Sequence, residues 1–274
     1  MSQRTVFFVS DHSGVTAETL GHSLITQFDD LEFKKVTVPF VSTADKARQT
    51  VRMIDLTGEA DGVRPIVFST LVQDDLRNIV RASGGFFLDF FDSFLGPLEV
   101  ELGVMSAHAT GRAHGMADPG SYDRRIEATN FALAHDDGAS VRGYEDAEVI
   151  LIGISRTGKT PTCLYLALQY GVFAANFPLT EDEFEAGGRI AMLPEHRDRL
   201  FGLTIEPARL EAIRRERRPG SRYASPQQVG FEVRQGEALF RKLGIPSLDT
   251  TRCSIEEIAS RILDETGLQR RSTA

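Results

Sequence analysis

The residues best suited to chemistry in this 274-residue chain lie near its middle, where eight consecutive positions fit the pattern G-x-x-x-x-G-K-S/T. This pattern is typical of a P-loop, in which backbone N–H groups surround phosphate oxygens and a lysine neutralises the terminal phosphates. The predicted nucleotide-binding residues are Gly153, Ile154, Ser155, Arg156, Thr157, Gly158, Lys159 and Thr160. Among them we expect Lys159 to act in catalysis and the Thr160 hydroxyl to be a Mg²⁺ ligand.

The sequence on both sides of this loop supplies the elements that a P-loop requires. Residues 147–152 form a short apolar run, which predicts a buried parallel strand. After the loop, apolar residues recur at helical spacing and stop at Gly171, while Pro161 falls in the first turn, where its missing N–H is not needed. A glycine turn that merely caps a helix is therefore the less favoured interpretation.

A second candidate site follows the first predicted strand, residues 5–9. The segment Ser10-Asp11-His12-Ser13-Gly14 joins this strand to a predicted helix over 15–28, at the place where open α/β sheets bind ligands. Asp11 is a candidate catalytic residue that would accept a proton or position an acceptor hydroxyl, and His12 could help to bind phosphate. The alternative is a turn in which Asp and Ser side chains satisfy the helix N-terminus. The residues alone leave both interpretations open.

The composition limits the class of protein. A hydrophobic fraction of 41% and a charged fraction of 26% are ordinary for a soluble enzyme. The net charge of −8 argues against nucleic acid as the main partner, because duplex binding needs a basic surface. The two cysteines, Cys163 and Cys253, form no paired motif, and no apolar run approaches the length of a signal peptide or a membrane span. We therefore expect a cytoplasmic protein without a membrane partner.

The alternation of strand and helix patterns predicts an α/β fold in two domains. Residues 1–145 are expected to form an N-terminal Rossmann-like domain with a parallel sheet, which would dock the target and hold the acceptor site. Residues 146–274 are expected to form a P-loop kinase-like α/β domain. Periodicity is lost over 106–122, and a stretch of this kind is usually a functional loop or a linker.

Several other groups of residues are ambiguous. His108, His114 and His135, with two acids after His135, include metal-ligand types but match no zinc spacing. A Walker-B acid should follow an apolar strand in the second half, and Glu206 is the nearest candidate. Residues 86–88 are expected to form a short strand, and the aromatic cluster over 86–94 is expected to be core, as suits a buried strand, and not a cofactor site. Five arginines could close over phosphates as a lid, although a solvated helix face is favoured for any single one: Arg214, Arg215, Arg217, Arg218 and Arg222.

Several segments together resemble one family, the regulatory proteins of phosphoenolpyruvate synthase and of pyruvate, phosphate dikinase. The resemblance spans nearly the whole chain and is far more specific than the P-loop alone. It rests on Val9-Ser10-Asp11-His12-Ser13-Gly14-Val15-Thr16-Ala17-Glu18, Tyr122-Asp123-Arg124-Arg125-Ile126-Glu127-Ala128, His135-Asp136-Asp137-Gly138, Ile154-Ser155-Arg156-Thr157-Gly158-Lys159-Thr160-Pro161-Thr162, Ala174-Ala175-Asn176-Phe177-Pro178-Leu179, Phe201-Gly202-Leu203-Thr204-Ile205 and Ser254-Ile255-Glu256-Glu257-Ile258-Ala259.

The resemblance implies a bifunctional serine/threonine kinase and phosphorylase. Such a protein would inactivate its target by phosphorylating a threonine with ADP as donor and Mg²⁺ as the metal. It would reactivate the target with inorganic phosphate as co-substrate, releasing pyrophosphate. Phosphoenolpyruvate synthase is the expected partner, because the chain lacks a plant-type extension, with pyruvate, phosphate dikinase as the alternative.

Two other functions remain compatible with the residues. One is an ATP-dependent small-molecule P-loop kinase, and the other is a nucleotide-sensing interaction protein without catalytic activity. The phosphoryl donor distinguishes these two functions from the family's activity. The sequence does not show whether ADP is selected over ATP. The oligomeric state also stays open, a homodimer included.

Overall fold

The computed structural model describes residues 3–107, 119–138, 141–186 and 189–269, which form two compact units, Met1–Gly115 and Met116–Ala274. This division lies before the expected boundary at 145/146. The reason is helix α5 (Pro119–Ala134), which packs against α6 (Lys159–Tyr170) and buries Ala128 and Ala132 in the core of the second unit. The loop expected over 106–122 falls largely on residues 108–118, so this expectation and those for His108 and His114 lie outside the described residues.

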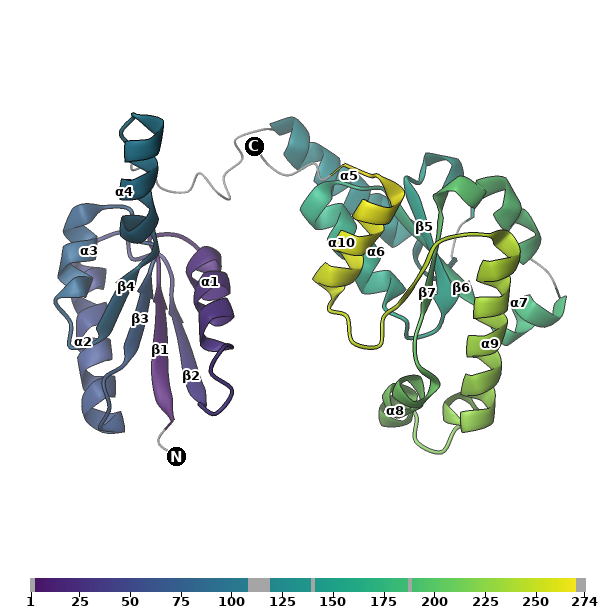
Figure 1. Cartoon of the computed structure of the whole chain (residues 1–274), viewed down its shortest axis with the longest axis horizontal. Helices are drawn as coiled ribbons and strands as arrows, with labels where there is room; N and C mark the ends of the chain where they lie inside the picture. The colour runs from purple at the N-terminus through teal and green to yellow at the C-terminus, as the bar shows by residue number, and fades with distance from the viewer. Residues whose placement is uncertain (1–2, 108–118, 139–140, 187–188, 270–274) are drawn as a thin grey trace. The chain divides into compact units, whose positions relative to one another are not determined.

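The first unit is a parallel sheet with helices on both faces, as Figure 1 shows. Its strand order is β2-β1-β3-β4, and alternate residues of β1 face opposite sides. Val6 and Phe8 pack against α1, whereas Phe7 and Val9 pack against α2 and α3. The elements are β1 (Arg4–Val9), α1 (Val15–Ile25), β2 (Phe33–Val38), α2 (Ala44–Asp61), β3 (Ile66–Ser69), α3 (Asp74–Arg81), β4 (Phe86–Asp89) and α4 (Phe90–Leu102).

The strand expected over 86–88 is confirmed as β4, but the aromatic cluster over 86–94 is less buried than expected. Strand β4 ends at Asp89, whose side chain accepts a 2.8 Å hydrogen bond from the backbone N–H of Asp92 and thereby caps α4. Phe86 is 44% exposed and Phe94 is 64% exposed. An N-cap signal inside the aromatic run thus divides it between a strand and a helix.

The second unit repeats the arrangement of the first. Its parallel sheet has the order β6-β5-β7-β8, so in both units the first strand of the unit lies between the second and the third. Helices α5, α6 and α10 cover one face, and α8 and α9 pack on the other (Figure 1). The remaining elements are β5 (Val149–Ile154), β6 (Ala174–Leu179), α7 (Glu181–Ala186), β7 (Leu200–Thr204), α8 (Pro207–Arg217), α9 (Pro226–Leu243), β8 (Ser247–Asp249) and α10 (Ile255–Thr266), with four 3₁₀ segments at Asp136–Gly138, Tyr144–Asp146, Arg189–Arg199 and Arg222–Ala224.

The predicted α/β fold class is therefore confirmed, and local signals explain several helix ends. Gly171 adopts a φ of 61° and ends α6, as its position after the apolar spacing predicts. Ser254 and Glu257 form a complete capping box at the start of α10. Within the described ranges, every helix is too short or too polar to cross a bilayer.

Candidate phosphate-binding site

The P-loop sequence forms the turn between β5 and α6, and its two glycines serve different purposes. Gly158 has a φ of 92° and caps α6, a backbone conformation that residues with a Cβ seldom adopt. Gly153 lies within β5, where a Cβ would stand 2.5 Å from the carbonyl oxygen of Leu203 in β7. Gly153 is thus needed for close approach of two strands, and Gly158 for the turn itself.

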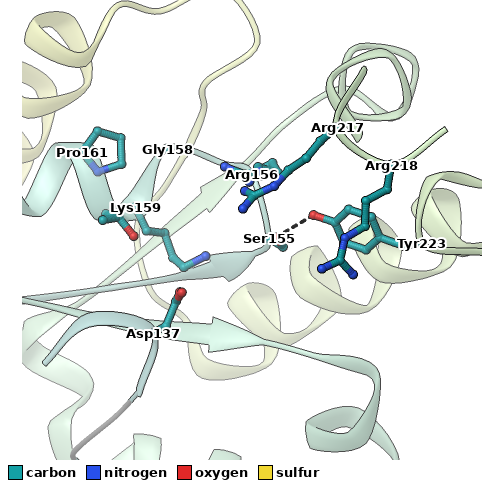
Figure 2. Close-up of a pocket in the computed structure, with 10 residues that line it drawn as sticks. Asp137, Ser155, Arg156, Gly158, Lys159, Pro161, Arg217, Arg218 and Tyr223 are labelled. Carbon is teal, nitrogen blue, oxygen red and sulfur yellow. Dashed lines mark hydrogen bonds between the residues drawn. The ribbon is translucent and has the colours of Figure 1, made fainter. Parts of the chain in front are cut away.

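A cavity of about 480 Å³ opens over this turn. Figure 2 shows that its wall combines the loop and the start of α6 with side chains from the end of α8 and from the turn after α5. The lining residues are Asp137, Ser155, Arg156, Gly158, Lys159, Thr160, Pro161, Arg217, Arg218 and Tyr223. The pocket therefore includes five of the predicted nucleotide-binding residues: Ser155, Arg156, Gly158, Lys159 and Thr160.

Lys159 is a buried cation at the base of this pocket. Its side chain is only slightly accessible, with the residue 5% exposed, and its Nζ donates a 2.9 Å hydrogen bond to the carbonyl oxygen of Ile154. Burial lowers the pKa of Lys159 from 10.5 to about 8, while the negative charge of Asp137 acts in the opposite direction. Lys159 forms no ion pair with the described residues, so its charge remains available to an anionic ligand.

Thr160 lies beside a carboxylate and an amide that are distant in sequence. Its Oγ1 donates a 2.8 Å hydrogen bond to Asp136 Oδ1, and Asn176 Nδ2 donates to the same carboxylate oxygen at 2.5 Å. Asn176 in β6 is fully buried, and its Oδ1 has no hydrogen-bond partner within the described part of the chain. Hydroxyl and carboxylate oxygens are the ligand types that Mg²⁺ prefers, so this arrangement fits the expected metal.

The acid beside the P-loop threonine is therefore not the one suggested by the strand pattern. Glu206 follows β7 but is exposed, and it does not line the pocket. Asp136 instead precedes the P-loop strand in sequence and follows α5. Because α5 packs against α6, Asp136 lies next to Thr160. Asp136 was not predicted from the sequence, because the acid was expected only after an apolar strand of the second half. The adjacent acids Asp136 and Asp137 were the available signal.

Arg214 also differs from expectation, because it is not part of a solvated helix face. It is fully buried, and its guanidinium forms a 2.6 Å ion pair with Glu232 of α9. The same group donates to the carbonyl oxygens of Ser155, at 3.2 Å, and Tyr223, at 3.0 Å. Arg214 thus ties α8 and α9 to the P-loop, whereas Arg215 is exposed, as expected of a solvated helix face.

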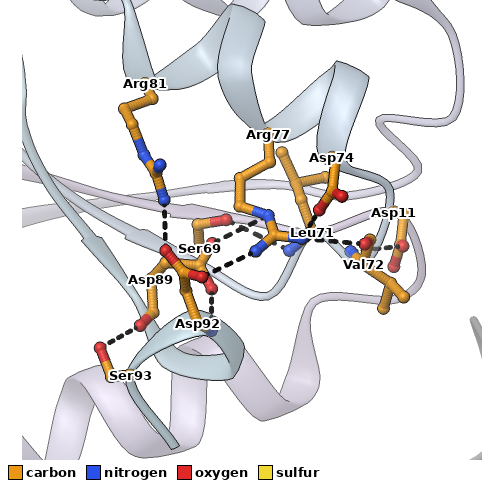
Figure 3. Close-up of polar contacts among 10 residues, drawn as sticks. All are labelled: Asp11, Ser69, Leu71, Val72, Asp74, Arg77, Arg81, Asp89, Asp92 and Ser93. Carbon is orange, nitrogen blue, oxygen red and sulfur yellow. Dashed lines mark hydrogen bonds and ion pairs between the residues drawn. The ribbon is translucent and has the colours of Figure 1, made fainter. Parts of the chain in front are cut away.

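Asp11 has a structural partner in the first unit. Its Oδ2 accepts a 3.1 Å hydrogen bond from the backbone N–H of Val72, in the loop that follows β3 (Figure 3). Close by, Arg77 donates to the Val72 carbonyl oxygen and pairs with Asp74 and Asp92. Asp11 therefore holds two loops together, and within the described residues α1 has no side-chain hydrogen bond at its N-cap, where the alternative interpretation expected one. A catalytic role for Asp11 stays a prediction, and His12 is exposed.

Fold and site together define an α/β protein with a cationic pocket over a glycine turn between a parallel strand and a helix. A family model described as "Kinase/pyrophosphorylase" matches residues 6–263, so the chain belongs to the kinase/pyrophosphorylase family. It is similar to proteins named "Putative phosphoenolpyruvate synthase regulatory protein". One from Pseudomonas putida (strain W619) is 52% identical over 98% of this chain and 99% of its own length, and one from Stutzerimonas stutzeri (strain A1501) is 53% identical with the same coverage.

Proposed function

We propose that this protein is a bifunctional serine/threonine kinase and phosphorylase that regulates phosphoenolpyruvate synthase. The observation that carries the proposal is the buried Lys159, which lies without an ion pair to the described residues at the base of a P-loop pocket. The family to which the chain belongs and the names of its relatives support both the phosphoryl chemistry and the target. Pyruvate, phosphate dikinase is the alternative target.

In the kinase direction, the P-loop would hold the phosphates of ADP. The N–H groups of the turn and the start of α6 favour negative charge, and Lys159 would neutralise charge on the β-phosphoryl group as it moves to a threonine hydroxyl. The products are AMP and phosphothreonine, and the hydroxyl loses a proton. Thr160 and Asp136 would hold Mg²⁺, which screens phosphate charge when bound.

In the phosphorylase direction, inorganic phosphate would occupy the same loop without the nucleotide. Both reactions move a phosphoryl group between two oxygens, so both should draw on Lys159, Thr160 and the backbone donors. The shared site explains why one small pocket can serve two reactions. We assign the first unit to target docking, with Asp11 as the candidate acceptor-side residue.

The donor specificity tests this proposal against its rivals. The protein is incubated with purified phosphoenolpyruvate synthase and either ADP labelled on the β-phosphate or ATP labelled on the γ-phosphate. We expect label from ADP on a synthase threonine, together with loss of synthase activity. Transfer from ATP to a metabolite would support the small-molecule kinase instead. ADP binding without any transfer would support a nucleotide-sensing protein.

A further inference from the structure

The pocket has a second group of cations that the donor site does not require. Arg156, Arg217 and Arg218 line it together with Lys159, and Asp137 is the carboxylate among the described lining residues. In Figure 2, Arg217 and Arg218 extend from the end of α8 on the side away from Lys159 and Asp137, and Arg156 lies between them and Lys159. The pocket therefore has a basic wall that faces its lysine.

These three arginines have no carboxylate partner in the described part of the chain. Other exposed arginines of the same region do have one, since Arg215 pairs with Glu211 and Arg222 with Glu181. A chain with a net charge of −8 has acids available to neutralise surface cations. Three unpaired guanidiniums around one pocket indicate a site for an anion.

The position of this basic wall is fixed by buried contacts. Arg214, one turn before Arg218, is held by Glu232 and by the P-loop carbonyl of Ser155, so the end of α8 is attached to the loop. Tyr223 adds a 2.8 Å hydrogen bond to the Ser155 hydroxyl. Arg156 has a φ of 78°, a conformation rare for a residue with a side chain and often found at ligand sites.

We propose that Arg156, Arg217 and Arg218 form a second phosphate subsite, which binds the phosphorylated threonine of the target opposite the phosphate held by the P-loop. The inference rests on the proposed function and adds to it the residues that recognise the phosphomonoester. A P-loop cradles its own phosphates with backbone N–H groups and its lysine, so the arginines are left for another phosphate group. Guanidiniums suit a phosphomonoester because their paired N–H groups match its oxygens.

The phosphorylase reaction requires two such subsites at once. An oxygen of hydrogen phosphate in the P-loop attacks the phosphorus of phosphothreonine, and a P–O–P bond forms as the bond from phosphorus to the threonine oxygen breaks. The proton of the hydrogen phosphate passes to the threonine oxygen, so the products are threonine and pyrophosphate. Two phosphate groups carry roughly four negative charges, and the described lining of the pocket opposes them with four cationic side chains against the single carboxylate of Asp137.

The double variant Arg217→Ala/Arg218→Ala tests this subsite, with Arg215→Ala as the matched control on the same helix. Fluorescence anisotropy measures binding of a labelled phosphothreonine peptide from the target and of its unphosphorylated form, and calorimetry measures binding of ADP. We expect the double variant to bind the phosphopeptide roughly tenfold or more weakly, because charge-assisted hydrogen bonds are lost. ADP affinity should change by less than about threefold, and the control should change neither.

Equal loss of ADP affinity would assign the arginines to the nucleotide and overturn the proposal. Unchanged phosphopeptide binding would show them to be solvated surface residues and would overturn it as well. In the phosphorylase assay, the KM for phosphorylated target should rise while the KM for inorganic phosphate is preserved. Because peptide binding requires no turnover, failure of the wild-type protein to transfer phosphoryl groups would contradict the proposed function and leave the subsite measurement interpretable.

Discussion

The Thr160 hydroxyl donates a 2.8 Å hydrogen bond to the carboxylate of Asp136, a residue 24 positions earlier in the chain. Packing of α5 against α6 creates this contact, because Asp136 immediately follows the turn that ends α5. P-loop proteins commonly hold Mg²⁺ between the loop hydroxyl and an acid from another strand. Here the acid that fits this role comes from a turn before the P-loop strand.

The first prediction concerns this acid. Asp136→Asn should remove most of the Mg²⁺-dependent gain in ADP affinity, because an amide is a weaker ligand and a poorer partner for the Thr160 hydroxyl. Calorimetric titration with ADP in the presence and absence of Mg²⁺ measures the gain directly. Glu206→Gln is the control, since Glu206 is exposed outside the pocket. If Glu206→Gln loses the Mg²⁺-dependent gain in ADP affinity and Asp136→Asn keeps it, the metal site lies at the end of β7 instead.

A second prediction follows from the lowered pKa of Lys159, which burial brings to about 8. Above that pH much of Lys159 is neutral in the free protein, and bound phosphate favours the charged form, so ADP binding should take up a proton. ADP affinity should consequently fall as the pH rises from about 8 toward the usual lysine range. Calorimetry near pH 8.5, in buffers of different ionisation enthalpy, would detect roughly one proton or less per ADP. Lys159→Arg should abolish the uptake, because arginine stays protonated.

The third prediction concerns the stability of the second unit. Arg214→Ala leaves Glu232 buried without its cation and should lower the free energy of unfolding by about 3–5 kcal/mol. Arg215→Ala, at the next position, removes an exposed pair and should cost less than about 1 kcal/mol. Urea denaturation followed by circular dichroism compares the two variants. Similar midpoints would mean that the ion pair between Arg214 and Glu232 contributes little.

A fourth prediction separates the two interpretations of Asp11. Asp11→Asn keeps an oxygen that can accept the hydrogen bond from Val72, so the first unit should remain folded. If Asp11 acts on the acceptor side, phosphoryl transfer should fall strongly while ADP affinity stays within about threefold of the wild type. Parallel turnover and calorimetric measurements decide this point. Full activity in a folded Asp11→Asn protein would leave Asp11 with its structural role alone.

Much of the fold could be predicted, because parallel α/β units leave strong local signals. The apolar runs over 5–9 and 147–152 placed β1 and β5 to within a few residues, and the pattern from Ile150 to Gly171 indicated strand, loop and helix in the right order. Local patterns could not predict the domain boundary, since the tertiary packing of α5 against α6 and β6 assigns residues 119–134 to the second unit. The two units share one strand order, but the sequence contains no repeat that could have predicted this similarity.

The residues of the candidate site could be predicted where they are contiguous in the sequence. They could not be predicted where tertiary packing brings them together. Gly158, Lys159 and Thr160 could be predicted because they belong to one continuous motif that forms a single turn of the chain. Asp136 and Arg214 reach that turn from other elements, and their charges alone do not reveal which side chain is buried. A run of arginines looks solvated in sequence, although one of them is fully buried against Glu232.

We propose that one P-loop site transfers the phosphoryl group in both directions. The most direct test adds inorganic phosphate to phosphorylated phosphoenolpyruvate synthase and measures pyrophosphate and recovered synthase activity with the wild type and with Lys159→Ala. We predict stoichiometric pyrophosphate with the wild type, and loss of both this release and ADP-dependent phosphorylation in a folded Lys159→Ala protein. Release of free phosphate without pyrophosphate, or full dephosphorylation by Lys159→Ala, would contradict the shared site.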